Sequence, residues 1–128
     1  MNETRLYDYW RSSASYRVRI ALNLLEEGHA FEPGNLLTNA HGETSYLAHN
    51  PQGLVPTLEI DGASLTQSLA IIEYLNETRP YAKFLPEDAL GRARVRALSH
   101  AIAMEIHPVC NLSVSRYAAE HSGGGITM

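Results

Sequence analysis

The order of strand-like and helix-like segments in residues 1–80 restricts the fold more than any other feature of this chain. Arg5–Tyr9 alternates in polarity and is rich in aromatic residues, which predicts a short strand. Tyr16–Glu27 carries apolar residues at helical spacing, and Ser12–Ser15 offers several N-caps. Gly28 is the predicted C-terminal stop of that helix.

Strand-like and helix-like segments continue to alternate in the rest of residues 1–80. Ala30–Leu36 predicts a second strand, and Pro33 favours a sheet edge because proline cannot donate to a ladder. Thr38–Asn50 is polar and predicts a loop with a short helix. The remaining predicted elements are a hairpin of Thr57–Ile60 and Ala63–Leu65 around Asp61-Gly62, and a helix from near Leu69 to near Thr78. A helical crossover followed by a hairpin predicts an α/β domain, a mixed sheet with flanking helices.

Pro80 and Pro86 mark the end of the alternating strands and helices. Residues 81–88 read as a linker between Pro80 and a helical stretch, Ala89–Ala119, which Pro108 is expected to bend or interrupt. We therefore expect a first domain at 1–80, a linker at 81–88 and a partial helical domain at 89–128. One or two helices cannot bury their own apolar faces, so the last segment must pack on the first domain or on a partner chain.

Composition narrows the classes of function. The chain has 128 residues and a net charge of −4, which argues against nucleic-acid binding. It contains no apolar run of membrane-spanning length, and no membrane partner is expected. The single cysteine, Cys110, excludes an internal disulfide framework and favours a cytoplasmic location. The six histidines form no pair with metal-ligand spacing, so we expect no metal site.

Serine hydroxyls stand at the start of the first predicted helix. A hydroxyl there can donate to an anion such as a thiolate, and the helix terminus favours the same charge. Each unit by which a thiol pKa is lowered needs about 1.4 kcal/mol of preferential thiolate stabilisation, which one charge-assisted hydrogen bond plus the helix terminus can supply. Taken alone, Ser12 is better explained as a plain helix cap.

Two further segments have both a binding and a structural interpretation. A cis bond before Pro56 would turn the backbone of Val55 outward to pair with an extended peptide, whereas an ordinary trans proline opening a strand is commoner. Gln67 and Ser68 precede a helix, where free N–H groups can bind a carboxylate, although a simple N-cap serine is again commoner.

Together these signals resemble a known family. The stretches Tyr7–Leu22, Asn50–Leu58, Gln67–Leu75 and Ile106–Ser113 are similar to zeta-class glutathione transferases, also called maleylacetoacetate isomerases. The resemblance covers essentially the first 118 residues. It implies a thioredoxin-like first domain followed by an all-α C-terminal domain, which is incomplete in this chain. The family motif commonly has cysteine at the position of Ala14.

The resemblance also implies a site. Ser12 would donate to the glutathione thiolate, with Ser13 beside it as the second catalytic residue. Val55 would pair its backbone with the cysteinyl part of the tripeptide, and Gln67 and Ser68 would hold its γ-glutamyl end. Further glutathione contacts are implied for His41, His107 and Asn111.

The implied activity is glutathione-dependent cis–trans isomerisation of maleylacetoacetate to fumarylacetoacetate, in tyrosine and phenylalanine breakdown. The implied partners are glutathione, a small acidic electrophile and a second copy of the chain in a homodimer. Two alternatives stay open at this point. One is general glutathione conjugation or dehalogenation, and the other is a glutathione-binding or interaction module without catalysis.

Overall fold

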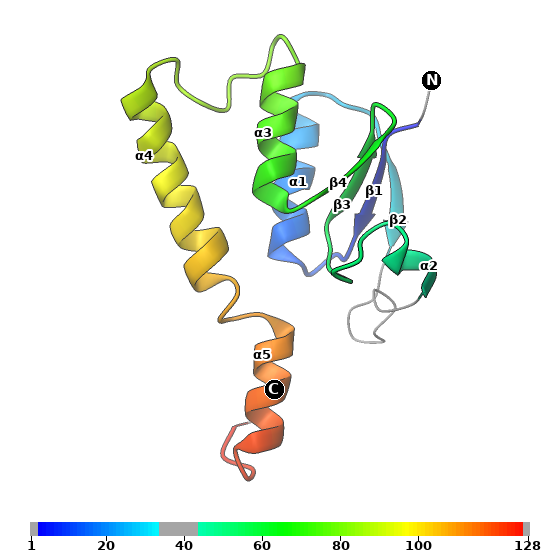
Figure 1. Cartoon of the computed structure of the whole chain (residues 1–128), viewed down its shortest axis with the longest axis vertical. Coiled ribbons are helices and arrows are strands. Elements are labelled where there is room, and N and C mark those ends of the chain that lie inside the picture. The colour runs from blue at the N-terminus through cyan, green and yellow to red at the C-terminus, as the bar shows by residue number, and fades with distance from the viewer. Residues whose placement is uncertain (1–2, 34–43, 127–128) are drawn as a thin grey trace. The chain divides into compact units, whose positions relative to one another are not determined.

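The computed structural model describes residues 3–33 and 44–126, and its contacts divide the chain into two units, Met1–Phe84 and Leu85–Met128 (Figure 1). The first unit contains a four-stranded sheet in the order β2-β1-β3-β4. Its strands are β1 (Arg5–Asp8), β2 (Ala30–Pro33), β3 (Thr57–Ile60) and β4 (Ala63–Thr66). Its helices are α1 (Ser13–Leu24), α2 (Thr44–Leu47) and α3 (Ser68–Thr78).

The sheet is mixed, as the order of predicted elements indicated. β1 pairs with β2 in parallel and with β3 antiparallel, while β3 and β4 form the predicted hairpin. β2 is an edge strand that ends at Pro33, which confirms the expectation drawn from that proline. The remainder of the predicted second strand, residues 34–36, lies outside the described residues.

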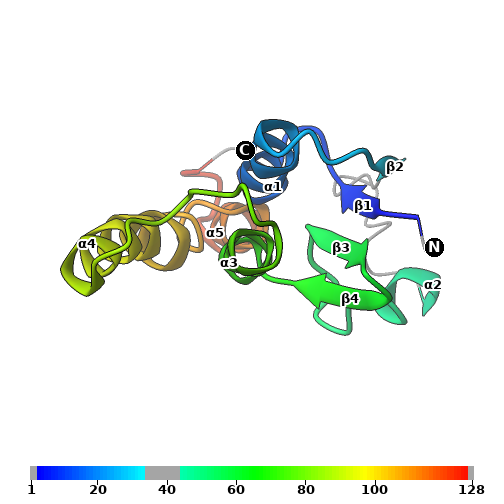
Figure 2. The same cartoon turned by 90° about the horizontal axis from the view of Figure 1, so that it is seen from above.

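The two faces of the sheet carry different layers. Figure 2 shows α1 and α3 on one side of the sheet and α2 on the other. Strand alternation points Leu6 and Leu58 towards α1 and α3, and both are fully buried. The same alternation points Tyr7 and Glu59 towards α2. The apolar core consists of Leu6, Val18, Ala21, Leu22, Leu25, Leu58, Ile60, Ile71 and Leu75.

The end of α1 differs from the prediction. The helix stops at Leu24, and Gly28 takes no part in its termination. Instead Glu26 adopts a left-handed φ of 53°. The N–H of Glu26 donates to the carbonyl of Asn23 at 3.1 Å, and that of Glu27 donates to Leu22 at 3.0 Å. This is a Schellman motif with glutamate where glycine is usual, so a search for glycine places the stop too late.

The second unit is helical in its described part. It contains α4 (Ala89–His100), the π-helix η3 (Ala101–Ile106) and α5 (Leu112–His121). The expected interruption near Pro108 is confirmed, because residues 107–111 separate η3 from α5. These helices have no buried residue. The domain boundaries 1–80, 81–88 and 89–128 stay a prediction.

No helix among residues 3–33 and 44–126 has both the length and the apolar character needed to cross a membrane.

Arg79 ties three chain segments together at the end of α3. Its guanidinium donates to both carboxylate oxygens of Glu27 at 3.1 Å and to Asp61 Oδ2 at 2.7 Å. The Tyr74 hydroxyl donates to the same Asp61 oxygen at 2.8 Å. These bonds, first that from Arg79 and then that from Tyr74, hold the pKa of Asp61 below its ordinary value. The cluster therefore links α3, the end of α1 and the β3–β4 turn.

We expect Arg79→Met to lower the free energy of unfolding by about 1–3 kcal/mol at neutral pH, because charge-assisted bonds to two carboxylates are lost. A carboxyl whose folded pKa is depressed stabilises the fold above its unfolded pKa. That stability is lost as the pH falls through the folded value. The difference in the free energy of unfolding between wild type and Arg79→Met should therefore become smaller below about pH 4. Urea unfolding at several pH values measures it.

Arg5→Met is the matched control, because the ion pairs of Arg5 with Glu3 and Glu32, both at 3.4 Å, are open to solvent. Its effect should be much smaller than that of Arg79→Met. Equal unfolding midpoints for the two variants would contradict the structural role of Arg79.

Candidate functional site

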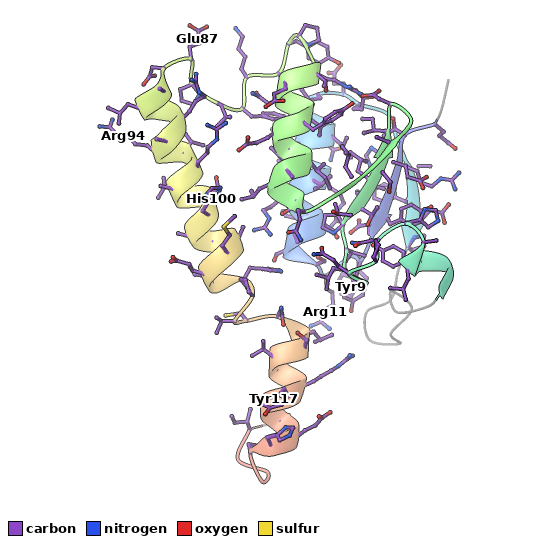
Figure 3. All side chains as sticks on the ribbon, in the orientation of Figure 1. Tyr9, Arg11, Glu87, Arg94, His100 and Tyr117 are labelled. Carbon is purple, nitrogen blue, oxygen red and sulfur yellow. The ribbon has the colours of Figure 1, made fainter. Side chains whose placement is uncertain are left out.

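The starts of α1 and α3 lie at one end of the first unit. β1 also ends there, and Asn50–Pro56 enters β3 from that end (Figure 1). Tyr9 and Arg11, which follow β1, mark this end among the side chains (Figure 3). Two helix N-termini directed to one end present unpaired N–H groups and the positive ends of two helix dipoles. The arrangement favours an anionic ligand.

Ser12 is the N-cap of α1. Its Oγ accepts a hydrogen bond from the Ser15 N–H at 3.2 Å, and its own N–H donates to the Tyr9 carbonyl at 2.9 Å. The capping interpretation is therefore confirmed. A serine hydroxyl has one proton and two lone pairs, and this cap uses a lone pair only. The hydroxyl of Ser12 is half-buried at the helix start and retains a proton to donate.

The neighbours of Ser12 are placed as the first residues of α1. Ser13 is exposed, and Ala14 is buried with 8% of its surface exposed. Ala14 has no thiol, so the side chain at this position offers no polar group. The Ser12 hydroxyl is held by its bond from the Ser15 N–H.

The segment before Ser12 is braced by residues that the sequence analysis did not single out. The carboxylate of Asp8 is 3.3 Å from Arg19 Nε, and Asp8 is 4% exposed. Arg19 also donates from Nη2 to the Trp10 carbonyl at 3.2 Å. The only signal for this pair was an acidic residue at the end of a strand and a basic residue on the next helix. Together they hold the turn that presents Ser12.

Val55 and Pro56 are joined by a cis peptide bond. This is the alternative that the sequence analysis weighed against a trans proline, and the preference for a trans bond from sequence alone was wrong. Val55 and Pro56 directly precede β3; Pro56 is buried and Val55 is half-buried. In the described part of the chain, no backbone hydrogen bond involves Val55. Its N–H and carbonyl are thus available to an extended peptide.

The start of α3 is open. The helix begins at Ser68, so this serine is not its N-cap. Gln67 holds the N-cap position with a left-handed φ of 69° and makes no side-chain capping bond. Its Nε2 donates instead to Gln52 Oε1 at 2.9 Å. Ser68 is 6% exposed. The first N–H groups of α3 therefore lack a side-chain cap.

The other predicted residues are not in the described part of the first unit. His41 is outside the described residues. His107 and Asn111 belong to the second unit, where Asn111 caps α5 by accepting from the Val114 N–H at 3.1 Å. The structure thus brings Ser12, Ser13, Val55, Gln67 and Ser68 into one unit.

A shallow apolar groove of about 220 Å³ lies elsewhere on the first unit. It is lined by Arg17, Ile20, Ala21, Leu24, Ile72 and Phe84. None of the predicted site residues lines it, so the groove gives no support to the predicted ligand site. Within the described ranges, no group of three or more histidine, cysteine, aspartate or glutamate residues could hold a metal ion.

Comparison with known proteins assigns the family. The family described as "Glutathione S-transferase, N-terminal domain" matches residues 6–84. The maleylacetoacetate isomerase of Rhizobium meliloti (strain 1021) is 62% identical over 124 residues, which are 97% of this chain and 58% of that protein. A maleyl pyruvate isomerase described as a zeta-class bacterial glutathione S-transferase is 42% identical with a TM-score of 0.89. The chain belongs to the zeta-class glutathione transferases.

Solved structures extend the comparison to the whole fold. The maleyl pyruvate isomerase match covers 93% of this zeta-class chain and 56% of that one. The maleylacetoacetate isomerase of Methylobacterium extorquens AM1, solved with malonate and glutathione bound, is 42% identical with a TM-score of 0.88 and the same coverage. The thioredoxin-like fold expected for the first unit is confirmed. This zeta-class chain spans a little more than half the length of the relatives it matches.

We expect Ser12→Ala to lower the free energy of unfolding by about 1 kcal/mol, because the Ser15 N–H loses its acceptor. Ser12→Asp should keep most of that stability, because aspartate is an equally good N-cap. Chemical denaturation of both variants measures the difference. Ser64→Ala is the control, since that exposed hydroxyl donates only to the His49 carbonyl at 3.3 Å. Equal losses in Ser12→Ala and Ser12→Asp would contradict the cap.

Proposed function

We propose that this zeta-class chain binds glutathione, with Ser12 as the donor to the thiolate. The observation that carries the proposal is the geometry of Ser12. Its hydroxyl is fixed by the Ser15 N–H at 3.2 Å and still has its proton, at a helix N-terminus that favours negative charge. Ser13, the next residue of α1, stands beside it as a second hydroxyl at the same helix start.

The other segments fit the rest of the tripeptide. The unpaired backbone of Val55 suits the cysteinyl residue, which is an extended peptide unit. The uncapped start of α3 at Gln67 and Ser68 suits the γ-glutamyl carboxylate, because helix N-termini bind anions. His41, His107 and Asn111 are proposed as further contacts on the strength of the resemblance. The named relative from Methylobacterium extorquens, solved with glutathione bound, supports this assignment.

The proposed reaction is cis–trans isomerisation of maleylacetoacetate, a small acidic electrophile, to fumarylacetoacetate in tyrosine and phenylalanine breakdown. When bound, glutathione supplies a thiolate whose reversible addition to the conjugated double bond leaves a single bond that can rotate. The chain's part is to keep that sulfur ionised. Ser12 donates one hydrogen bond to it, and the dipole of α1 favours its charge. The 62% identity to a maleylacetoacetate isomerase supports this activity over general conjugation.

We expect the 128-residue chain to bind glutathione in calorimetry and to isomerise maleylacetone. Ser12→Ala should raise the pKa of the bound thiol by about one unit, since one unit corresponds to about 1.4 kcal/mol of thiolate stabilisation. Turnover at neutral pH should fall by up to about tenfold, because one pKa unit lowers the thiolate fraction by that factor. The ultraviolet absorbance of the thiolate, followed against pH, gives the pKa.

Ser99→Ala is the matched control, because the Ser99 hydroxyl donates to Val95 within α4 at 2.9 Å. It should leave the thiol pKa unchanged. Normal turnover in Ser12→Ala would contradict the role of Ser12. Glutathione binding without any turnover would favour a binding module, and faster reaction with a haloacid than with maleylacetone would favour conjugation or dehalogenation.

We further propose a homodimer in the cytoplasm. The single cysteine, Cys110, is exposed and unpaired, which suits a reducing compartment. The described helices of the second unit have no buried residue, while Leu98 is 72% exposed and Met104 is 61% exposed. Apolar helix faces of this kind are usually covered by a partner.

Sedimentation should therefore show association, and Leu98→Glu should weaken it by placing a charge on the apolar face. Phe31→Glu is the control, because Phe31 is 55% exposed on β2 of the first unit. A strictly monomeric profile for the wild-type chain would contradict the proposed dimer.

A further inference from the structure

The carbonyl of Leu54, directly before Val55, receives two side-chain donors. The Tyr46 hydroxyl donates to it from α2, and Asn50 Nδ2 donates to it at 2.8 Å. The side chain of Leu54 itself is 52% exposed, so its carbonyl is fixed by these bonds and not by burial of the residue. The peptide unit that contains this carbonyl also contains the N–H of Val55. Fixing one end of the unit therefore orients the other.

Asn50 is built into the turn that leads to Leu54. It is 2% exposed, and its Oδ1 accepts from the Gln52 N–H at 3.0 Å while its carbonyl accepts from Gly53 at 2.9 Å. Gly53 has a φ of 64°, which a side chain would disfavour. Both polar atoms of the Asn50 amide are thus committed, one to the turn and one to Leu54.

Tyr46 contacts the residues on both sides of Val55 and Pro56. Its oxygen lies 2.9 Å from Thr57 Oγ1, and Thr57 is fully buried. Since the single hydroxyl proton of Tyr46 goes to Leu54, Thr57 is the donor in the second bond. Burial raises the pKa of Tyr46 above its ordinary value, which already leaves the hydroxyl protonated at neutral pH. The Tyr46 ring packs edge-on against Tyr7 with centroids 5.7 Å apart.

The turn at Asn50–Gly53 also contacts the second segment proposed to bind the tripeptide, Gln67 and Ser68 at the start of α3. Gln52 Oε1 accepts from Gln67 Nε2 at 2.9 Å, and Gln67 has the left-handed φ of 69°. The turn therefore contacts both segments that the proposed function assigns to the tripeptide, through Asn50 at one and Gln52 at the other.

We infer that Tyr46 and Asn50 are positioning residues for ligand binding: they hold the Leu54 carbonyl and so orient the backbone of Val55 towards the tripeptide. The inference rests on the proposed binding of glutathione. Neither residue contacts the ligand in this scheme. Their contribution is to fix the Val55 N–H before binding, which removes the cost of ordering that group when the ligand arrives.

Tyr46→Phe tests the inference, because it removes the donor to Leu54 and leaves the ring against Tyr7. Calorimetry compares glutathione with the same tripeptide bearing a methyl group in place of the thiol. Tyr46→Phe should weaken both ligands alike, by about fivefold, the factor that one net hydrogen bond is worth. Ser12→Ala should weaken glutathione more than the thiol-free tripeptide. A merely structural role for Tyr46 would shift the melting temperature without changing either affinity.

Tyr7→Phe is the matched control. Its hydroxyl is 3.3 Å from His49 Nε2 and 3.5 Å from Glu59 Oε1 on the same face of the sheet. It should leave both affinities close to those of the wild type, because the hydroxyl that it removes is bonded to His49 and Glu59 and not to Leu54. If Tyr46→Phe does not fold, Thr57→Val carries the test, because it removes the hydroxyl that donates to Tyr46 and keeps the side-chain shape. It should weaken both ligands alike, and unchanged affinities would overturn the inference.

The outcomes separate the two proposals. Wild-type affinity for both ligands in Tyr46→Phe overturns the inference and leaves glutathione binding standing. A wild-type chain that binds neither ligand overturns glutathione binding and the inference with it. A loss confined to the thiol-bearing ligand also overturns the inference, because Val55 would then not be the group affected.

Discussion

The packing of α1 and α3 on one face of the sheet determines where the site can be. Leu6 and Leu58 are buried on that face, and Val18 and Ile71 join the same core from the two helices. Because both helices start at the end where β1 stops, their unpaired N–H groups are directed to that end (Figure 1). The apolar core thus fixes the direction of two helix dipoles before any polar side chain is considered.

The opposite face of the sheet carries polar and aromatic side chains that contact α2. There Tyr7 contacts Tyr46 and His49, with ring centroids 5.7 and 4.7 Å apart, and His49 Nδ1 lies 2.7 Å from a Glu59 carboxylate oxygen. This polar and aromatic layer holds α2 on the sheet. From α2 the Tyr46 hydroxyl reaches the Leu54 carbonyl. One face therefore fixes the helices, and the other fixes the segment between α2 and β3.

The sequence was sufficient for the elements whose signal is local. Alternation and helical spacing predicted the strands, the hairpin and the main helices, and Ser12 was recognised as a cap. Prediction from the sequence failed where the local structure depends on a contact between distant residues or on an unusual backbone conformation. Glu26 takes a left-handed conformation that glycine normally takes, so the end of α1 was misplaced. The bond of Tyr46 to Leu54 depends on how α2 lies on the sheet, and no spacing in the sequence reports that.

The structural and the binding interpretations of the site residues are compatible, because each structural role leaves one group unused. Ser12 caps α1 through a lone pair and keeps its hydroxyl proton. Gln67 occupies the N-cap position of α3 without capping it, so the helix N–H groups stay open. The Leu54 carbonyl is held by two donors, while the adjoining N–H of Val55 has no backbone partner among the described residues. Three ordinary features of the fold, each with a spare donor, together suit an extended anionic peptide.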